Sequence, residues 1–545
     1  MKRYIYTIIL AAGCLTACQK NDIEKTPLNQ WTEEYVFDEK DSVGDFAKGF
    51  LIETYSNLPT GFNRIGGNVL ESASDDAIAS QTSSTIERFT NGQISSFNNP
   101  DDQWAKNYTG IRRANIFLAN VGKVPFKQSM ITEKNYWIAE ARFLRAYFYF
   151  ELVKRYGGVP LLGERVLTIN DNLSIPKNTL AECAQYILNE CDEVKGALRK
   201  DPISDADLGR ATQAAALALK SRLLLYMASP LYNANALAAN DPKWKDAADA
   251  AREVMKLNVF SLHSSFSTLF TTRKNTEVIL AFQRANGNDV ETNNTPVGYA
   301  GPVTANGYTS PTQELVNAFE MKDGKSYTQS ALYDANNPYL NRDPRFYLTI
   351  FHNGFKWLNR NIETFEGGKD KPGGIVTQTR TGYYMRKFMG DFTSSTVFSS
   401  QTHNFMLFRY AEILLNFAEA QNEYSGPDAD VYKAIEDIRR RAGLVPFALP
   451  LNLNKDQMRE VIRHERRVEM AFEEQRFWDI RRWKIAETVL NGSLHGMRIT
   501  KTGTTLTYEP YEAAKVSFSA PKMYIYPISY DEITKNRSLV QNTGW

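Results

Sequence analysis

Apolar residues recur at helical spacing over much of the chain, with one long interruption. From Trp137 to Leu152 they follow one another at intervals of four, three, four and four, which predicts an amphipathic helix. Gly157-Gly158 should end it. Further helices are predicted over 38–57, 178–199, 210–228 and 243–257, then over 404–424, 428–442 and 455–488. The protein is therefore expected to be mainly α-helical.

These helices follow one another in pairs joined by short turns. Such pairing is typical of tetratricopeptide-like solenoids, although no strict repeat of about 34 residues is present. The helix over 210–228 is apolar nearly all round, apart from Lys220, Ser221 and Arg222. We therefore expect it at the centre of the helical scaffold.

Two stretches lack this periodicity. Residues 59–100 are rich in Gly, Ser, Thr, Asn and Asp, whereas residues 272–402 are dominated by Gly, Pro, Asn, Thr and aromatic side chains. Short strands are predicted in the second stretch over Val278–Phe282 and Phe346–Phe351. Long irregular segments of a compact protein are usually functional or disordered. Residues 272–402 are too many for a linker, so we expect them to form a large loop-rich face.

The N-terminus indicates an exported protein. Two basic residues precede an uncharged, mostly apolar run over 5–15, which has the length of a signal-peptide core and is too short to span a bilayer. The run ends in the sequence LTAC, which resembles the lipobox of bacterial lipoproteins. A signal peptide over 1–17, lipidation of Cys18 and a polar tether over 18–37 are predicted. A plain secretory leader is the alternative.

No disulfide bond is expected, although the protein is predicted to be exported. Cys14 is lost with the leader and Cys18 carries the lipid, which leaves Cys183 and Cys191. These two lie eight residues apart in a helical pattern, about 12 Å along the helix axis, which is too far for a disulfide. Both are expected to be free and buried.

The charge balance argues against one class of partner. The chain has 64 basic and 62 acidic residues, and loss of two basic residues with the leader takes the formal charge from +2 to 0. Nucleic-acid binding depends on clustered Lys and Arg, so none is expected. Aromatic residues make up 12% of the chain, more than a core needs, which suggests that some of them meet a ligand.

Motifs for cofactor and metal binding are incomplete. The G-K-S at 324–326 lacks the earlier glycine of a phosphate-binding loop, because Phe319 stands there. His464 and Glu465 begin like a zinc-binding helix, but Val468 occupies the place of the second histidine. The five histidines are not at ligand spacing. No cofactor and no metal ion is therefore expected.

Two features leave hydrolysis open. Asp75-Asp76 is the most prominent acid pair in a loop, and glycosidases use two carboxylates whose separation only the fold determines. Turn capping is the alternative role for this pair. The segment 465–483 is dense in Glu, Arg and aromatic residues. We expect it to be a helix whose charges join neighbouring helices, rather than an acid–base cluster.

Several ordered motifs resemble the SusD/RagB family of outer-membrane lipoproteins. In the N-terminal half they are EARFLRAY at 140–147, YGGVPL at 156–161, and Trp104, Tyr108, Ile111, Asn115 and Leu118 on the preceding helix. In the C-terminal half they are RYAE at 409–412, AEA at 418–420, IRRRAG at 438–443, the segment 465–483, YPI at 526–528 and QNTGW at 541–545. Thr543 departs from the proline common there. The likeness spans nearly the whole chain.

The resemblance implies a mainly α, tetratricopeptide-like scaffold of helical pairs, with a large loop-rich face that contains short strands. It implies an N-terminal helical region over 38–271 and a C-terminal region over 272–545 with a loop-rich insert over 272–402. It also implies a protein that is not an enzyme. Such a protein is lipid-anchored at the outer membrane, facing outside, and passes its ligand as a lid to a SusC-like TonB-dependent transporter.

The implied ligand is a glycan or, as in a few members of the family, a peptide. Sugars present apolar faces edged by hydroxyl groups, so a site needs flat aromatic platforms beside polar side chains. The family places such contacts in the loop after the first helix and in the central loop region. By region, the candidates here are Trp357, Tyr299, Tyr308, Asp75, Asp76, Asn98 and Arg360.

Alternatives to this site remain. Trp357 could pack loop against scaffold, and each tyrosine could be structural. The cations near Trp357 are interspersed with acids, so an anionic glycan is not indicated. Glycan capture, peptide capture with the same architecture, and a lipoprotein glycosidase using carboxylates such as Asp75 are the three functions that remain open.

Overall fold

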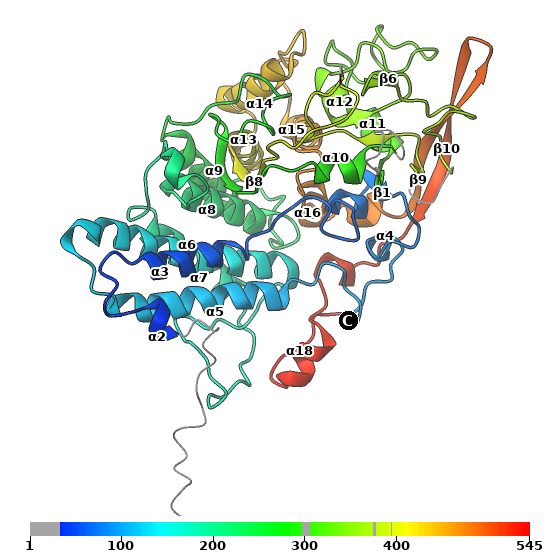
Figure 1. Cartoon of the computed structure of the whole chain (residues 1–545). Helices are drawn as coiled ribbons and strands as arrows, with labels where there is room; N and C mark the ends of the chain where they lie inside the picture. The colour runs from blue at the N-terminus through cyan, green and yellow to red at the C-terminus, as the bar shows by residue number, and fades with distance from the viewer. Residues whose placement is uncertain (1–32, 297–305, 374–377, 394) are drawn as a thin grey trace, which may run out of the picture.

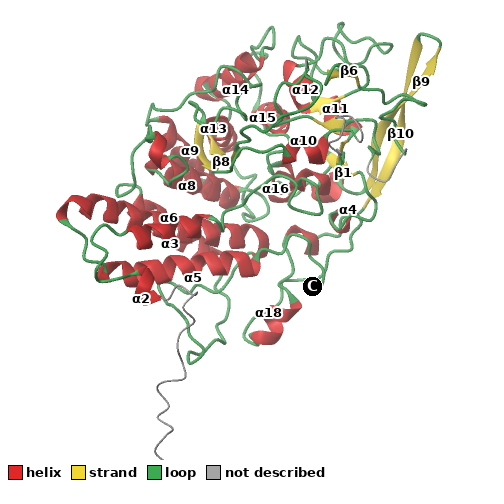
Figure 2. Ribbon diagram, in the orientation of Figure 1, coloured by secondary structure: helices red, strands yellow, loops and turns green. Residues whose placement is uncertain are grey.

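The computed structural model describes residues 33–296, 306–373, 378–393 and 395–545. Helices prevail over strands in these residues, as the sequence predicts. Figure 2 shows most of the helices on one side of the molecule and the strands and long loops mainly on the other. The predicted lipidation site, Cys18, and the candidate Tyr299 lie outside the described residues.

Successive helices of the N-terminal half pack against one another. These are α2 (Glu33–Val36), α3 (Asp45–Tyr55), α4 (Glu87–Thr90), α5 (Trp104–Asn120), α6 (Ile131–Tyr156), α7 (Leu180–Val194), α8 (Gln213–Ala228) and α9 (Pro242–Met255). Helix α5 contacts α6, α6 contacts α7, α7 contacts α8 and α8 contacts α9, which gives the layered stack in Figure 1. This arrangement confirms the helical-pair scaffold.

Local sequence determines where these helices begin. Thr179 starts α7 with a capping box, because its hydroxyl accepts from the backbone N–H of Glu182 while the Glu182 side chain caps Thr179. Thr212 caps α8 and Asp241 caps α9 in the same way, by accepting from a backbone N–H of the first turn. Helix α8 is buried on nearly every side, as predicted.

The C-terminal half contributes shorter helices and small sheets. Its helices are α10 (Asp289–Asn294), α11 (Gln313–Ala318), α12 (Pro344–Thr349), α13 (Tyr410–Ser425), α14 (Ala429–Ala442), α15 (Lys455–Glu469), α16 (Arg476–Arg482), α17 (Ala486–Val489) and α18 (Tyr530–Lys535). Helix α13 packs against both α9 and α8. The N-terminal and C-terminal helices therefore form one body.

Each sheet in the described residues is an antiparallel pair of strands. The pairs are β1 (Ala77–Ala79) with β3 (Thr309–Pro311), β2 (Val278–Phe282) with β8 (Phe405–Arg409), β4 (Ile350–Phe351) with β7 (Tyr384–Met385), β5 (Lys356–Trp357) with β6 (Arg360–Asn361), and β9 (Gly492–Thr502) with β10 (Thr505–Val516). The prediction of a strand over Val278–Phe282 is confirmed, with the same bounds.

Three predicted elements are wrong in part. The helix predicted over 404–424 starts as strand β8, because residues 405–409 pair with β2 before α13 begins. The strand predicted over 346–351 is mostly helix α12, since Asp343 caps it and Pro344 occupies its first turn. The helix predicted over 455–488 breaks into α15, α16 and α17, and Phe472 between the first two has a φ of 64°, which no α-helix accommodates.

The buried apolar side chains form two large clusters. The first joins the helical layers and draws residues from both halves, so that Leu223 of α8 and Leu415 of α13 belong to one core. The second lies mainly under the loops of residues 266–406 and includes Phe351 and Trp357. The boundary at 271 stays a prediction. Cys183 and Cys191 are free and buried, as expected.

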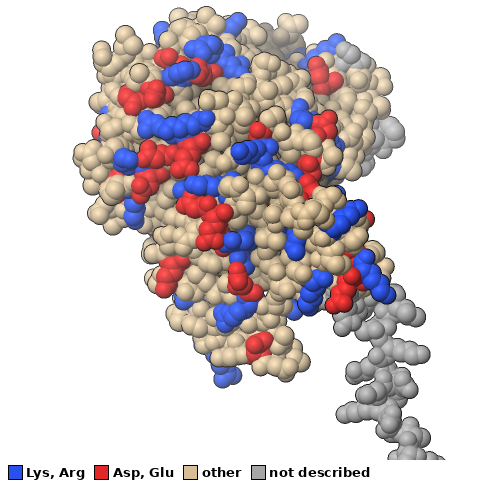
Figure 3. Space-filling model, turned by 90° about the vertical axis from the view of Figure 1, so that its left-hand side faces the viewer, with Lys and Arg blue, Asp and Glu red and all other residues tan. Residues whose placement is uncertain are grey.

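The charged segment 465–483 is structural. Arg409 lies 2.7 Å from Glu469 and 2.6 Å from Glu277, with all three side chains at most 1% exposed. Arg482 pairs with Glu419 at 2.5 Å in the same interior. These ion pairs join elements far apart in sequence, which confirms the prediction that this segment connects helices. On the surface seen in Figure 3, by contrast, basic and acidic side chains are interspersed.

Candidate ligand-binding site

The two loop regions named by the resemblance meet at a short sheet. Strand β1 pairs with β3 in the register Ile78 to Ser310, so residues about 230 positions apart lie side by side. Arg380 fastens a third loop to this sheet, because its backbone N–H donates to Ser310 Oγ at 3.0 Å and its guanidinium donates to Ala79 O at 3.0 Å. The same guanidinium pairs with Glu87 at 3.0 Å.

Tyr308 lies next to this sheet and is half-buried. Its carbonyl accepts from Ser80 N at 2.8 Å, and its own N–H donates to Asn293 O at 2.9 Å. One side of its ring covers Gly67, where a Cβ would lie 2.5 Å from Tyr308 Cδ2. Gly67 has a φ of 84°, so glycine serves both the backbone turn and the close approach of the ring. Tyr308 therefore stays a candidate platform.

Trp357 is not an exposed platform, which corrects the strongest candidate from the sequence. Its side chain is fully buried, at 0% exposure. The ring packs 4.9 Å from Phe351 and 5.7 Å from Phe392, between centroids. The alternative role, packing loop against scaffold, is the one the structure shows, because the loops need a core of their own and large aromatic side chains fill it.

Asp75 and Asp76 are also unavailable to a ligand in this structure. Both are buried, and Arg476 holds Asp75 through two hydrogen bonds of 2.8 and 2.7 Å. Arg467 pairs with Asp76 at 2.7 Å. Burial alone would raise the pKa of Asp75, but the charges of Arg467 and Arg476 outweigh it and lower that pKa to about 2. The acid pair proposed for hydrolysis is thus tied to the scaffold.

Arg360 and Asn98 each make hydrogen bonds with nearby side chains. Asp370, which is fully buried, accepts two hydrogen bonds from Arg360, each of 2.8 Å. Asn98 accepts from Ser95 Oγ at 2.7 Å. The turn that carries Asn98 sits on α18, because Tyr530 N donates to Ser96 O. Figure 1 shows α18 at the lower edge of the molecule, below β1.

A hollow of about 540 Å³ adjoins the β1–β3 sheet and was missed from the sequence. Its lining residues come mainly from the loop around residues 364–373 and from the long hairpin of β9 and β10. Its lining includes Tyr511, Arg380, Arg498, Lys371, Glu366 and Thr364. Alternating side chains on either side of Gly503 could have indicated the hairpin, but nothing local shows which loop it faces.

Tyr511 is held at a fixed angle within this hollow. Its hydroxyl donates to the carbonyl of Arg380, and burial raises its pKa to about 12, so it stays protonated. The guanidinium of Arg498 lies 5.5 Å from its ring centroid. Arg498 is about half exposed and its nearest carboxylates, Glu366 and Glu509, are 3.8 Å away. An aromatic face with loosely paired charged neighbours therefore borders open space.

Two kinds of feature are absent from the described residues. No group of three His, Cys, Asp or Glu side chains among them is placed to hold a metal ion. Within the same residues, no helix combines the length and the apolar character needed to cross a membrane.

Comparison with known proteins identifies the family. A family model described as "SusD family" matches residues 276–545, and one described as "Starch-binding associating with outer membrane" matches residues 51–225. The fold is also that of a SusD-like protein of Bacteroides fragilis, with 30% identity, coverage of 95% of this chain and 100% of the other, and a TM-score of 0.80. The chain belongs to the SusD/RagB family.

Other SusD-like proteins extend the likeness. A SusD-like carbohydrate binding protein of Bacteroides fragilis is 25% identical, with a TM-score of 0.76 and coverage of 92% of this chain and 99% of the other. SusD-like protein P2 of Formosa agariphila is 23% identical over 99% of both chains. The mainly helical SusD-like fold expected from the sequence is confirmed.

Proposed function

We propose that this SusD-like protein is a cell-surface lipoprotein that captures an oligo- or polysaccharide on its loop-rich face. The hollow beside β1 and β3, with Tyr511 as its aromatic platform, is the proposed binding site, and Tyr308 extends it. The observation that carries this proposal is the placement of Tyr511 between Arg498 and the backbone of Arg380, next to open space.

This arrangement suits a sugar chemically. The tyrosine ring offers a flat apolar face to the C–H face of a pyranose, while Arg498, Lys371, Glu366 and Thr364 border the same hollow and can bond its hydroxyl groups. The starch-binding description of the matched family model supports a glycan as the ligand. Tyr299 stays a proposed contact on sequence grounds.

Delivery to a transporter is the second part of the proposal. The protein is proposed to be attached to the outer membrane through lipid on Cys18 and to act as the lid of a SusC-like TonB-dependent transporter. The lipobox-like sequence and the outer-membrane association in the family description support this location.

The test is a glycan array followed by affinity gel electrophoresis of Tyr511→Ala. Binding of at least one glycan by the native protein and a loss of tenfold or more in the variant are expected. Tyr508→Ala is the matched control, because Tyr508 lies on the same strand but packs its ring against Tyr339, 5.6 Å away. Release of reducing ends from a bound glycan, or binding of peptides alone, would overturn the proposal in favour of a glycosidase or of peptide capture.

A further inference from the structure

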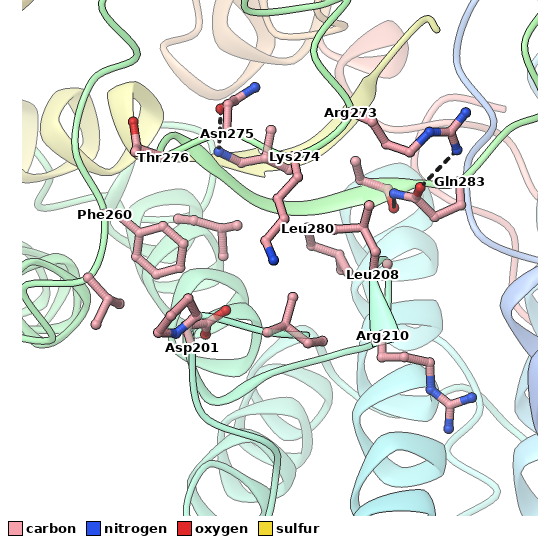
Figure 4. Close-up of a pocket in the computed structure, with 17 residues that line it drawn as sticks. Asp201, Leu208, Arg210, Phe260, Arg273, Lys274, Asn275, Thr276, Leu280 and Gln283 are labelled. Atoms are coloured by element: carbon pink, nitrogen blue, oxygen red, sulfur yellow. Dashed lines mark hydrogen bonds between the residues drawn. The ribbon is translucent and has the colours of Figure 1, made fainter. Parts of the chain in front are cut away.

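A second cavity lies away from the proposed glycan site. It holds about 380 Å³ and shares none of its lining residues with the hollow at Tyr511. Three segments enclose it: residues 201–210 before α8, residues 259–260 after α9, and residues 273–283, which include β2 (Figure 4). Its size falls in the range of small-molecule sites, about 300–1,000 Å³.

The walls of this cavity are mainly apolar. Leu208, Phe260 and Leu280 surround its interior in Figure 4, and Val259 contributes an apolar side chain that is 39% exposed. Apolar walls of this kind cannot bond the many hydroxyl groups of a sugar, and burying a hydroxyl group without a hydrogen-bond partner is unfavourable. Burial of an alkyl or aryl group in this cavity would instead be favourable, because it removes apolar surface from water.

Two cations border the same cavity. Among the residues that the structure describes, Arg273 has no carboxylate within ion-pair distance; it donates to the neutral oxygens Gln283 Oε1 at 3.3 Å and Asn286 Oδ1 at 2.9 Å. Lys274 reaches into the cavity in Figure 4. Its carboxylate partner is Asp205, 2.5 Å away, whose side chain is 89% exposed. Such an exposed pair is weak and can be exchanged for a ligand anion.

The lining holds two other charged residues, Arg210 and Asp201. The side chain of Arg210 points away from the cavity in Figure 4 and pairs with Glu140 at 2.6 Å. Asp201 is half-buried, and one of its carboxylate oxygens is enclosed by protein without a hydrogen-bond partner. Burial raises the pKa of this carboxyl group, which weakens its negative charge beside the cations. The cavity therefore combines apolar walls with a cationic border formed by Arg273 and Lys274.

We propose that this cavity binds a small amphipathic anion, that is, a single carboxylate, sulfate or sulfonate group on an alkyl or aryl body. The apolar body would lie between Phe260 and Leu208, and the anionic group would replace Asp205 at Lys274. Arg273, whose side chain points toward Gln283 in Figure 4, adds a second positive charge farther along the border. This site is independent of the glycan site and does not rest on the function proposed above.

The test is calorimetric titration of the mature chain with sodium decanoate. Cys18→Ser in all proteins keeps lipid and detergent out of the measurement. Saturable binding with one equivalent of decanoate is expected, with at least tenfold weaker binding in the double variant Arg273→Gln/Lys274→Gln. Lys243→Gln removes a charge from an exposed position on α9 outside the cavity and should bind decanoate normally.

Two further measurements keep the outcome decisive. Decyltrimethylammonium has the same alkyl chain and the opposite charge, so it should neither bind nor displace decanoate. Leu208→Trp should fill the cavity and abolish binding while thermal unfolding monitored by circular dichroism stays cooperative. No saturable binding of decanoate, equal binding of the cation, or normal binding by Arg273→Gln/Lys274→Gln would overturn the proposal.

Discussion

Arg409 and Glu469 face one another in the interior, with their nearest side-chain atoms 2.7 Å apart. Arg409 begins the helical C-terminal half, at the junction of β8 and α13, whereas Glu469 ends α15. Arg345 and Arg441 also reach Glu469, so one carboxylate joins three basic side chains from separate elements. This cluster holds the loop-rich face against the helical scaffold, and so gives the proposed glycan site a fixed base.

Glu469→Gln tests that role. The substitution keeps the shape of the side chain but leaves several buried guanidinium groups without their shared counter-charge, so the free energy of unfolding should fall by about 3–5 kcal/mol. Urea unfolding followed by circular dichroism measures the loss. Glu512→Gln is the control, because Glu512 is about half exposed on β10 and should change stability by less than about 0.5 kcal/mol. Equal midpoints for the two variants would contradict the assignment.

Acid should destabilise the fold through its buried carboxylates. Burial alone would raise the pKa of Glu151 and of Glu419, but Lys154 and Arg155 lower the first to about 2, and Arg482 chiefly lowers the second to about 2. Unfolded glutamate has a pKa of about 4.3. Because the folded pKa is the lower one, the stability is fully present above the unfolded pKa and is lost as pH falls toward 2.

Urea midpoints at pH 7, 5, 4 and 3 measure this dependence. We expect little change from pH 7 to 5 and a steep fall below that. Glu419→Gln should be less stable at pH 7 and should show a shallower fall with acid. A midpoint that stays constant down to pH 3 would contradict the buried ion pairs as the source of acid sensitivity.

Trp357 should matter for folding and not for ligand contact. Trp357→Ala removes a fully buried ring and should lower the free energy of unfolding by about 3–5 kcal/mol. Trp357→Phe keeps most of the packing and should bind glycan as the native protein does, whereas Tyr511→Ala should lose binding and keep its unfolding midpoint. Affinity gels beside thermal melts separate the two effects. Weak glycan binding by a stably folded Trp357→Phe would restore Trp357 as a contact.

Gly67 should be required for the position of Tyr308. In Gly67→Ala the new Cβ would lie 2.5 Å from the Tyr308 ring, at a φ of 84° that alanine adopts at a cost of about 1–2 kcal/mol. We expect a lower melting temperature and weaker glycan binding. Gly49→Ala is the matched control, because nothing lies within 4 Å of its Cβ and its place in α3 favours alanine. That variant should be as stable as the native protein or slightly more so.

Lipidation is tested by Cys18→Ser. Each acyl chain contributes about 0.8 kcal/mol per buried methylene group, so two or more chains should keep the native protein in the membrane fraction. The variant should appear in the soluble fraction, with its glycan binding unchanged. Continued membrane association of Cys18→Ser in salt-washed membranes would argue against a lipid anchor at this residue.

Helix positions were readable from the sequence because a helix is a local structure. The stripe from Trp137 to Leu152 lies in α6, and Thr179 caps α7, since both signals depend on neighbours within a few residues. Where prediction failed, long-range pairing decided. Residues 405–409 have a helical pattern, yet they form β8 because β2 lies beside them. The break between α15 and α16 depends on a positive φ at Phe472 that no pattern announces.

The candidate site was harder to predict for the same reason. Asp75 looks like a free acid in a loop until Arg476, about 400 residues later, is placed 2.7 Å from it. Trp357 looks like a loop aromatic until Phe351 and Phe392 surround it. The alternating pattern around Tyr511 gives no sign of a binding site. Only the fold places β9 and β10 beside the loop around residue 370. Burial of a loop side chain depends on contacts that sequence spacing does not encode.

The sequence by itself determined the helical scaffold, the family resemblance and the structural nature of the segment 465–483, because short-range periodicity and ordered motifs carry that information. The export signal stays a prediction from the sequence. Only the tertiary structure decided which loop residues face solvent. It buried Trp357, tied Asp75 and Asp76 to arginines, and left Tyr511 and Tyr308 partly open. The physical reason is that loops of this length need their own core and ion pairs, and the aromatic side chains left over from that core remain for a ligand.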